Sequence, residues 1–261
     1  MGFGAATAAR GGRDAAAAMA LSINGLAYDT TFPPMTERVE NSHITYARTL
    51  ERFIRPGERW LDVGCGHSLV PEWIQDQPTS LLGRAVGLDR DQRALGAHAG
   101  LRHKTCGDVH RLPFADRTFD VVTANMVVEH VEEPVGFFRE VRRVLRPGGR
   151  LLIHTPNALG YTTRLARAVP ERLKPLLAVV LQRRATEDVY PAFYRANTQA
   201  ALGDIARQSG LALTTCDFVM TSPQLGGVPG AALIERRWLQ RLSSEQHASD
   251  RPVLVATFSR D

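Results

Sequence analysis

The stretch Trp60-Leu-Asp-Val-Gly-Cys-Gly-His-Ser-Leu69 decides the fold of this chain. Its apolar start predicts a short buried strand over residues 59–63, and the next helix is expected to begin near Ser68. Gly64 and Gly66 lie between the two. Because glycine has no Cβ, it permits a tight turn and lets a ligand approach the backbone closely. In doubly wound α/β folds, nucleotide-like ligands bind at such a strand, glycine turn and helix.

A second strand is predicted from Ala85 to Asp89, and it ends on an acidic residue. Asp89 follows Asp62 of the first strand by 27 residues, the length of one strand–helix–strand unit. A carboxylate at this place can accept both hydroxyls of a ribose, because it has two acceptor oxygens. The alternative is a loop aspartate that caps the next helix, predicted over residues 90–99.

The composition indicates one globular domain of 261 residues, 44% of them hydrophobic, with a net charge of +5. The basic residues are almost all arginine. A GC-rich genome explains this bias without any binding role, and an anion-binding surface is the alternative. Cys65, Cys106 and Cys216 lie far apart, which indicates a reducing compartment and no disulfide framework. Residues 1–20 are expected to form a flexible tail. With no secretory signal and no apolar run of membrane-spanning length, a cytoplasmic location is expected.

Two further segments complete the predicted core. A helix over residues 37–54, with Thr36 as its N-cap, precedes the first strand. The motif Gly107-Asp-Val-His-Arg-Leu-Pro-Phe-Ala-Asp116 leads into an apolar strand, residues 119–124, that is typical of the centre of a parallel sheet. That strand delivers Asn125 and Met126 at its carboxyl end, where open α/β sheets bind ligands.

The segment after this strand alternates helix, turn and strand. A helix is expected to begin at Pro134, with an apolar face that includes Phe137 and Phe138, and with Arg139, Glu140, Arg142 and Arg143 on its solvent face. Residues 146–149 predict a turn, and residues 150–154 a fifth strand. The last part of the chain predicts a helix capped by Asn197 and ending at Gly210, a strand over 211–220, a loop over 221–230, a helix over 231–242 and a strand over 252–259.

Taken together, these motifs resemble those of the class I S-adenosylmethionine (SAM) dependent methyltransferases, especially the small-molecule subgroup like those of ubiquinone and menaquinone biosynthesis. The resemblance covers about residues 58–157. It implies an α/β, doubly wound, Rossmann-like sheet of seven strands, mostly parallel, with the last strand antiparallel beside the fifth. Residues 21–56 would then form an N-terminal lid region, and residues 57–261 a methyltransferase domain with a helical cap inserted at about 158–195.

The resemblance also implies SAM as the cofactor, no metal ion, and a set of contact residues. Asp89 would hold the ribose, Asp108 the adenine amino group, and the glycine turn the methionine end. The residues expected to bind the cofactor are Asp62, Gly64, Cys65, Gly66, Asp89, Arg90, Gly107, Asp108, Val109, Asn125 and Met126.

The segment 158–195 is longer than a simple link between a strand and a helix, and long segments at the ligand end of a sheet are usually functional. It carries seven basic and three acidic residues and several aromatic ones. A cap for an acidic or phosphorylated acceptor is one interpretation, and a solvated helical surface is the other. Candidates for binding the acceptor are Tyr28, His43, Tyr161, Tyr194 and Arg195.

Four other functions compete with methyl transfer to a small molecule. A dinucleotide fingerprint would need glycine at position 69, where this chain has Leu69. Methyltransferases of exocyclic base amines carry a Pro-Pro-aromatic motif after the fourth strand, and this chain reads Asn125-Met-Val-Val128 there. The chain also has no zinc-ligand cluster and no separate basic domain, so nucleic acid is not expected as a partner. A protein methyltransferase and a SAM-binding module without activity stay as alternatives, since fold alone does not decide function.

The expected reaction is attack by an acceptor oxygen, nitrogen or carbon on the methyl group of SAM. An amine acceptor needs no base, whereas a hydroxyl or a carbon acid does. The candidates for a general base are His130 and His154, both at carboxyl ends of predicted strands, and His43 on the lid helix. A histidine considered alone is more often structural.

Overall fold

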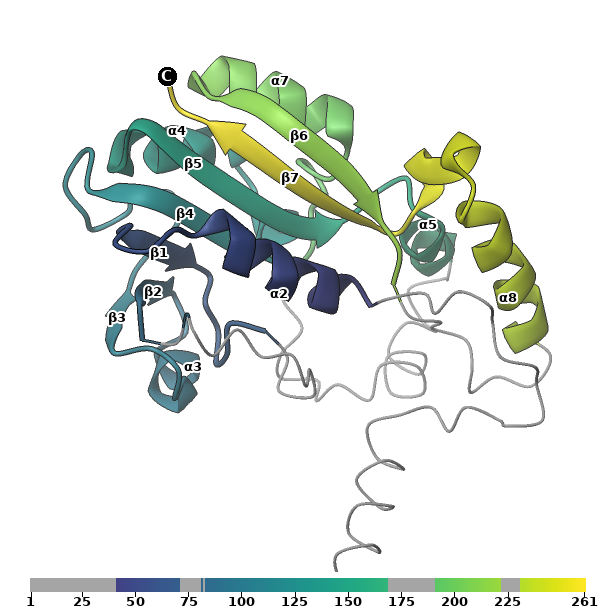
Figure 1. Ribbon diagram of the computed structural model, residues 1–261, viewed down its shortest axis with the longest axis horizontal. Helices are drawn as coiled ribbons and strands as arrows, with labels where there is room; N and C mark the ends of the chain where they lie inside the picture. The colour runs from purple at the N-terminus through teal and green to yellow at the C-terminus, as the bar shows by residue number, and fades with distance from the viewer. Residues whose placement is uncertain (1–40, 71–80, 82, 169–190, 222–230) are drawn as a thin grey trace, which may run out of the picture.

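The computed structural model describes residues 41–70, 81, 83–168, 191–221 and 231–261. Within them, seven strands form one sheet in the order β3-β2-β1-β4-β5-β7-β6 (Figure 1). The strands are β1 Trp60–Val63, β2 Ala85–Asp89, β3 His103–Cys106, β4 Phe119–Asn125, β5 Leu145–Pro156, β6 Ala212–Val219 and β7 Val253–Ser259. The helices are α2 Ser42–Phe53, α3 Gln92–Ala97, the 3₁₀ helix η2 Val128–His130, α4 Pro134–Val144, α5 Tyr161–Ala168, α7 Gln199–Ser209, α8 Ala231–Leu242 and the 3₁₀ helix η6 Glu245–Asp250.

The pairing of the strands confirms the predicted fold class. Strand β1 pairs in parallel with β2 and β4, and the pairs β2–β3 and β4–β5 are also parallel. Strand β7 lies antiparallel between β5 and β6. The order of the strands reverses between β1 and β4, so the carboxyl ends of these two strands form the crevice in which doubly wound folds bind ligands.

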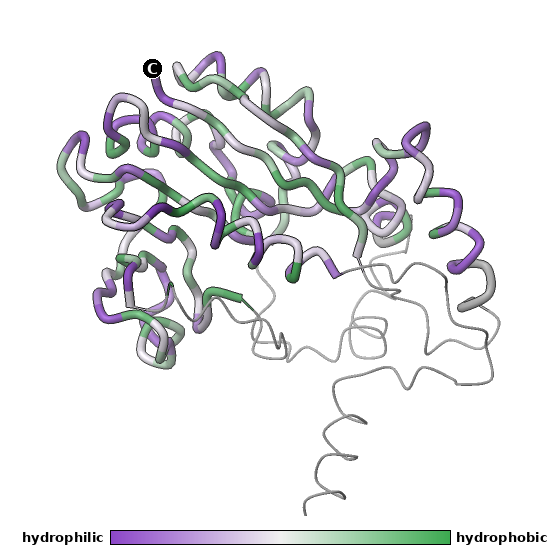
Figure 2. The backbone as a smooth tube through the Cα atoms, in the orientation of Figure 1, coloured by the Kyte–Doolittle hydropathy of each residue, from purple (hydrophilic) through white to green (hydrophobic). Residues whose placement is uncertain are grey.

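Alternation along the strands divides the core into two layers, because successive side chains point to opposite faces of a sheet. One layer lies under α2 and joins Tyr46, Ala47 and Leu50 of that helix to Trp60, Val121, Leu152 and Val255 of the sheet. The other lies under α4 and α7 and includes Leu61, Val63, Val122, Ala124, Leu151 and Ile153. Figure 1 shows α2 on one face of the sheet, with α4 and α7 on the other, and Figure 2 shows apolar residues concentrated in the central strands.

The N-terminal helix begins later than its sequence periodicity predicts. Asn41 has extended backbone angles (φ −68°, ψ 136°), and its side chain accepts a hydrogen bond from the N–H of His43 at 2.9 Å. Asn41 is therefore the N-cap, and the predicted continuous helix from residue 37 is wrong. The predicted cap Thr36 lies outside the described residues.

Helix α7 also has a different cap from the predicted one. The hydroxyl of Thr198 accepts from the N–H of Ala201 at 3.1 Å, which makes Thr198 the N-cap. Asn197 is fully buried instead, and its amide donates to Thr155 Oγ1 at 2.7 Å and to the carbonyl of Pro156 at 3.0 Å. The predicted end of α7 at Gly210 is confirmed, since this residue has a left-handed backbone with φ 75°.

Three other elements differ from the sequence-based predictions. Residues Ser68–Val70 are not helical, and residues 71–80, where the helix after the glycine turn was expected to continue, lie outside the described part. Helix α3 is shorter than predicted and is capped by Asp91. The predicted turn at residues 146–149 is an irregular start of β5, which begins at Leu145.

The expected flexible tail, Tyr28, and residues 169–190 of the expected cap also lie outside the described residues. In the described ranges, no helix combines the length and apolar character needed to cross a membrane.

Candidate functional site

The glycine turn after β1 is held against the end of β2. The N–H groups of Gly64 and Cys65 both donate to the carbonyl of Leu88, at 2.7 and 3.1 Å. Gly64 and Gly66 have left-handed backbones, with φ 65° and 55°, which explains the need for glycine at both. A Cβ on Gly64 would collide with Val127, whereas a Cβ on Gly66 would meet no atom within 4 Å. The space beside Gly66 therefore suits close approach of a ligand.

Asp89 closes the turn from the side of β2. Its Oδ2 accepts from the N–H of Gly66 at 2.9 Å, and its Oδ1 accepts from the N–H of Asp91 at 2.8 Å. Each oxygen keeps a further lone pair, so both can accept a ribose hydroxyl. The helix-capping alternative for this carboxylate is wrong, because Asp91 caps α3 through bonds to the N–H groups of Arg93 and Ala94.

A buried polar chain supports the first strand beneath α2. The indole N–H of Trp60 donates to Thr123 Oγ1 at 2.8 Å, and the Thr123 hydroxyl donates to Asp62 Oδ1 at 2.5 Å. Asp62 is only 3% exposed. Burial raises the pKa of its carboxyl to about 7, an effect that the Thr123 bond opposes and the nearby Asp89 adds to. A positive charge placed beside this carboxyl would favour its ionised form.

The carboxyl end of β4 is connected to the glycine turn and to β5. Asn125 donates from Nδ2 to the carbonyl of Leu69 at 3.1 Å, so its Oδ1 is the atom that faces His154 Nδ1 at 2.7 Å. Since an amide oxygen only accepts, His154 carries its proton on Nδ1. Met126 follows with φ 53°, a strained conformation for a side-chain-bearing residue, and its N–H donates to the carbonyl of His154 at 2.7 Å.

Helix α2 covers His154. The ring of Tyr46 stacks on it with centroids 4.9 Å apart, and the ring of His43 meets it edge-on at 5.0 Å. His154 is 0% exposed, and burial, with a smaller contribution from His43, lowers its pKa well below the usual value. Among the described residues, the buried His154 Nε2 has no hydrogen-bond partner. A fully buried ring is poorly placed for a general base that must reach an acceptor, and the predicted base role of His154 stays a prediction.

His130, the other predicted base, lies in η2 directly after β4. Its Nδ1 is 2.8 Å from the carbonyl of Pro191, which places a proton on Nδ1, and its Nε2 lies 3.9 Å from Oε1 of Glu129. The side chain is 34% exposed. Next to it, buried Glu129 accepts from Thr155 Oγ1 at 2.9 Å. His130 is therefore more accessible than His154, and its role as a base stays a prediction.

The predicted adenine motif begins against Asp89. The N–H of Gly107 donates to the carbonyl of Asp89 at 3.0 Å, which places Asp108 and Val109 beside the predicted ribose site. Oδ1 of Asp108 accepts from the N–H of His110 at 2.9 Å, and this bond lowers the pKa of the Asp108 carboxyl. The side chain is 69% exposed, so its second oxygen is accessible to a ligand.

Two other residues expected at the cofactor differ in character. Cys65 is buried, and its Sγ lies 2.8 Å from where a Cβ on Gly87 would stand, so its side chain packs between the turn and β2. Burial raises the pKa of the Cys65 thiol well above its usual value, which keeps it neutral. Arg90 is exposed directly after Asp89. Their cofactor roles stay predictions, as do those of the other residues in this set.

Three predicted acceptor-binding residues contact other parts of the protein. The Tyr161 hydroxyl donates to Glu235 Oε1 of α8 at 3.2 Å, and burial next to this carboxylate raises its pKa. Tyr194 has φ 54°, and the guanidinium of Arg167 lies over its ring at 5.1 Å. Arg195 donates to the carbonyl of Glu132 at 2.7 Å. These contacts join α5 to α8 and to Tyr194, and join Arg195 to the link between η2 and α4.

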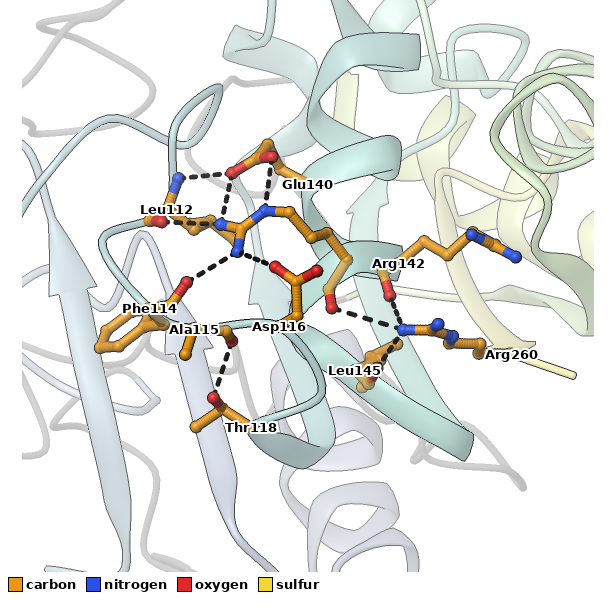
Figure 3. A network of polar contacts seen from close by, with 10 residues as sticks. Leu112, Phe114, Ala115, Asp116, Thr118, Glu140, Arg142, Leu145 and Arg260 are labelled. Carbon is orange, nitrogen blue, oxygen red and sulfur yellow. Dashed lines mark hydrogen bonds and ion pairs between the residues drawn. The ribbon is translucent and has the colours of Figure 1, made fainter.

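Glu140 and Arg143 are predicted from the sequence on the solvent face of α4, with no part in the site. Both are partly buried and bind the segment that follows the adenine motif, as Figure 3 shows for Leu112, Phe114 and Asp116. An acidic and a basic residue three positions apart on one helix face were the only signal available. That spacing suggests an ion pair, but it does not reveal the loop that the pair contacts.

The fold and the residues at the carboxyl ends of β1, β2 and β4 resemble those of class I SAM-dependent methyltransferases. The family model described as "Methyltransferase domain" matches residues 61–153, which run from β1 to β5. Every residue predicted to contact the cofactor lies within this span.

Comparisons with known proteins agree with this class. A probable SAM-dependent methyltransferase of Mycolicibacterium smegmatis is 32% identical over 161 residues, which cover 58% of this chain and 58% of that protein. A ubiquinone biosynthesis O-methyltransferase of Parvibaculum lavamentivorans is 34% identical and covers 41% and 44% of the two chains. This chain spans between 31% and 58% of the length of the first curated relatives it matches. A SAM-dependent methyltransferase structure from Methanosarcina mazei has a TM-score of 0.53 at 14% identity, covers 81% and 96% of the two chains, and supports the fold alone.

Proposed function

We propose that this protein transfers the methyl group of SAM to a small-molecule acceptor. The observation that carries the proposal is the placement of Asp89. Its carboxylate lies beside the open space at Gly66, and the adenine motif begins on its own backbone carbonyl. One end of a nucleoside can thus meet the carboxylate while its base meets Asp108.

The residues present fit SAM along its length. Asp89 would accept the ribose hydroxyls, and Asp108 with the backbone of Val109 would meet the adenine. Asp62, buried next to the glycine turn, would face the ammonium group of the methionine end, with Asn125 and Met126 nearby. When bound, SAM supplies a methyl group on a sulfonium that is already activated. The protein then has to position the acceptor and exclude water.

An acceptor with a hydroxyl group requires a base, and we assign that role to His130. Its Nδ1 proton is engaged by Pro191, and Nε2, which lies 3.9 Å from Oε1 of Glu129, would take the proton that the acceptor hydroxyl loses. Relatives named as a ubiquinone biosynthesis O-methyltransferase and as demethylmenaquinone methyltransferases support a small-molecule acceptor. The free cysteines Cys65, Cys106 and Cys216 support a reducing, cytoplasmic setting for the reaction.

The test has two stages. Calorimetric titration of the full chain with SAM and with S-adenosylhomocysteine should show binding of both, and an absence of binding would overturn the proposal. Incubation with methyl-labelled SAM and fractionated small-molecule extracts should then transfer label to a compound identified by mass spectrometry. Label found only in protein or in nucleic acid would contradict a small-molecule acceptor. The variant His130→Gln should reduce turnover of a hydroxyl acceptor while leaving SAM affinity unchanged.

A further inference from the structure

Arg143 of α4 holds the segment that follows the adenine motif. All five of its N–H donors are used. Nη2 donates to the carbonyl of Leu112 at 2.9 Å, and Nη1 donates to the carbonyl of Phe114 at 2.7 Å and to Asp116 Oδ1 at 2.9 Å. The remaining two donors bind Glu140, from Nε to Oε1 at 2.9 Å and from Nη2 to Oε2 at 2.8 Å.

Glu140 makes the attachment two-sided. Its Oε2 also accepts from the N–H of Leu112 at 2.9 Å, so both backbone polar groups of Leu112 are bound to the same pair of side chains. The Leu112 side chain is buried in the core, and the ring of Phe114 meets that of Phe119 edge-on at 5.0 Å. The side chains of Arg143 and Glu140 are 30% and 21% exposed, which shields their charged bonds from water.

The adenine motif is therefore held by hydrogen bonds at both of its ends. At one end, the N–H of Gly107 is bonded to the carbonyl of Asp89. At the other end, Leu112 is bonded to Arg143 and Glu140. Between them lies a single turn, in which the N–H of Arg111 donates to the carbonyl of Asp108 at 3.1 Å. A shift of the Leu112 anchor would be passed to Asp108 through this turn.

We propose that Arg143, with Glu140, is a positioning pair that sets Asp108 and Val109 at the distance the adenine ring requires. This inference rests on the proposed SAM-binding function and assigns the pair no contact with the cofactor. It accounts for the use of arginine, because the planar fork reaches Leu112, Phe114, Asp116 and Glu140 at once. Lysine has three donors on one nitrogen and cannot span them.

Two other features of the described residues support no comparable inference. The exposed Trp238 and Leu165 lie on α8 and α5 among arginines, but nothing in the structure shows what covers them. The stacked pair Tyr46 and His154 belongs to the site already described. The Arg143 network is set apart by its three contacts with one loop and two with Glu140 of its own helix.

The experiment compares two ligands that differ at the base. S-Adenosylhomocysteine carries the adenine amino group, whereas S-inosylhomocysteine has a carbonyl oxygen at that position. Wild type should bind the adenine compound about tenfold more tightly, because Asp108 accepts from the amino group. In Arg143→Lys, the affinity for S-adenosylhomocysteine should fall about tenfold and the preference for adenine should largely disappear. The control Arg139→Lys, at an exposed position of the same helix, should behave as wild type.

A purely structural role predicts a different pattern. It would lower the melting temperature of Arg143→Lys but leave the adenine preference of the folded protein intact, and that result would overturn the inference. Glu140→Gln is a milder variant that is expected to fold, so the inference can be tested on it as well. It should raise amide exchange at residues 108–114 in the ligand-free protein. Unchanged exchange there would also contradict the inference. If wild type bound neither compound, the proposed function itself would fail, and the role of Arg143 with it.

Discussion

The N–H of Gly66 donates a hydrogen bond of 2.9 Å to Oδ2 of Asp89, which joins the glycine turn to the end of the neighbouring strand. The same carboxylate is the predicted partner of the ribose. Asp89→Asn should therefore lower SAM affinity by about 10- to 100-fold, because the amide has one acceptor oxygen in place of two. Titration calorimetry measures the change. Asp204→Asn, at an exposed acidic residue of α7, is the matched control, and equal affinities in wild type and Asp89→Asn would contradict the ribose assignment.

The two glycines of the turn should respond differently to alanine. At Gly64 an added Cβ meets both a left-handed backbone and the side chain of Val127, so Gly64→Ala should destabilise the fold by about 2–4 kcal/mol. At Gly66 only the backbone conformation is strained, and the cost should be about 1 kcal/mol. Urea denaturation compares the two variants. Adding Val127→Ala to Gly64→Ala should recover part of the loss, and no recovery would show that the collision is not its cause.

Much of the fold can be predicted from the sequence, because the core strands and helices follow local patterns of apolar residues. The apolar run of β4 and the buried face of α4 follow directly from periodicity, and the spacing from Asp62 to Asp89 marks one strand–helix–strand unit. Strand β3 was not predicted, since its residues are mostly exposed and carry no apolar pattern. The caps show the same limit. Asn197 has the residue type of a cap, but tertiary contacts bury it, and its neighbour Thr198 takes that place.

The residues of the candidate site also fall into two groups, those that the sequence predicts and those that it does not. Glycines and acidic residues at strand ends are visible as motifs, because their chemistry depends on local backbone geometry. The roles of His154 and Arg143 depend on which distant segments pack against them. His154 looked like a base from its position at the end of β5, and only the packing of Tyr46 shows that it is enclosed. Arg143 looked like a solvent-exposed residue, and only the fold brings Leu112 to it.

Asp62 should make the stability of the ligand-free protein depend on pH. Its folded pKa of about 7 lies above the usual value of 3.8, so between pH 4 and 7 the folded state binds a proton that the unfolded chain has released. The free energy of unfolding therefore falls as pH rises across this window. Asp62→Asn removes that loss and keeps an oxygen for the Thr123 hydroxyl. The variant should be more stable than wild type at pH 8 by on the order of 2–4 kcal/mol, and similar at pH 4.

The same substitution should weaken SAM binding at pH 8. The ionised carboxylate is the proposed partner of the cofactor's ammonium, and an amide cannot supply that charge. Chemical denaturation from pH 4 to 8, with Asp204→Asn as the control for losing an acidic residue, tests the stability half of the prediction. Titration of the variant with SAM tests the binding half. A parallel pH dependence of the unfolding free energy in wild type and Asp62→Asn would refute the role of burial.

His154 should have the opposite effect to Asp62, so that the free energy of unfolding falls as the pH falls. Burial lowers its folded pKa below the usual 6.5, so its contribution to stability is complete above that pH and is lost as pH falls below it. The loss can reach about 1.4 kcal/mol per pH unit. His154→Gln retains a donor for Asn125 Oδ1 but cannot titrate, so its unfolding free energy should fall less than that of wild type between pH 6.5 and 5. His103→Gln, at an exposed histidine of β3, controls for the loss of a histidine. Because the ring lies under Tyr46 and His43, the protection factors of the α2 amides, corrected for the intrinsic pH dependence of exchange, should fall in wild type over this interval. Protection factors that stay constant would show that α2 does not depend on the neutral ring.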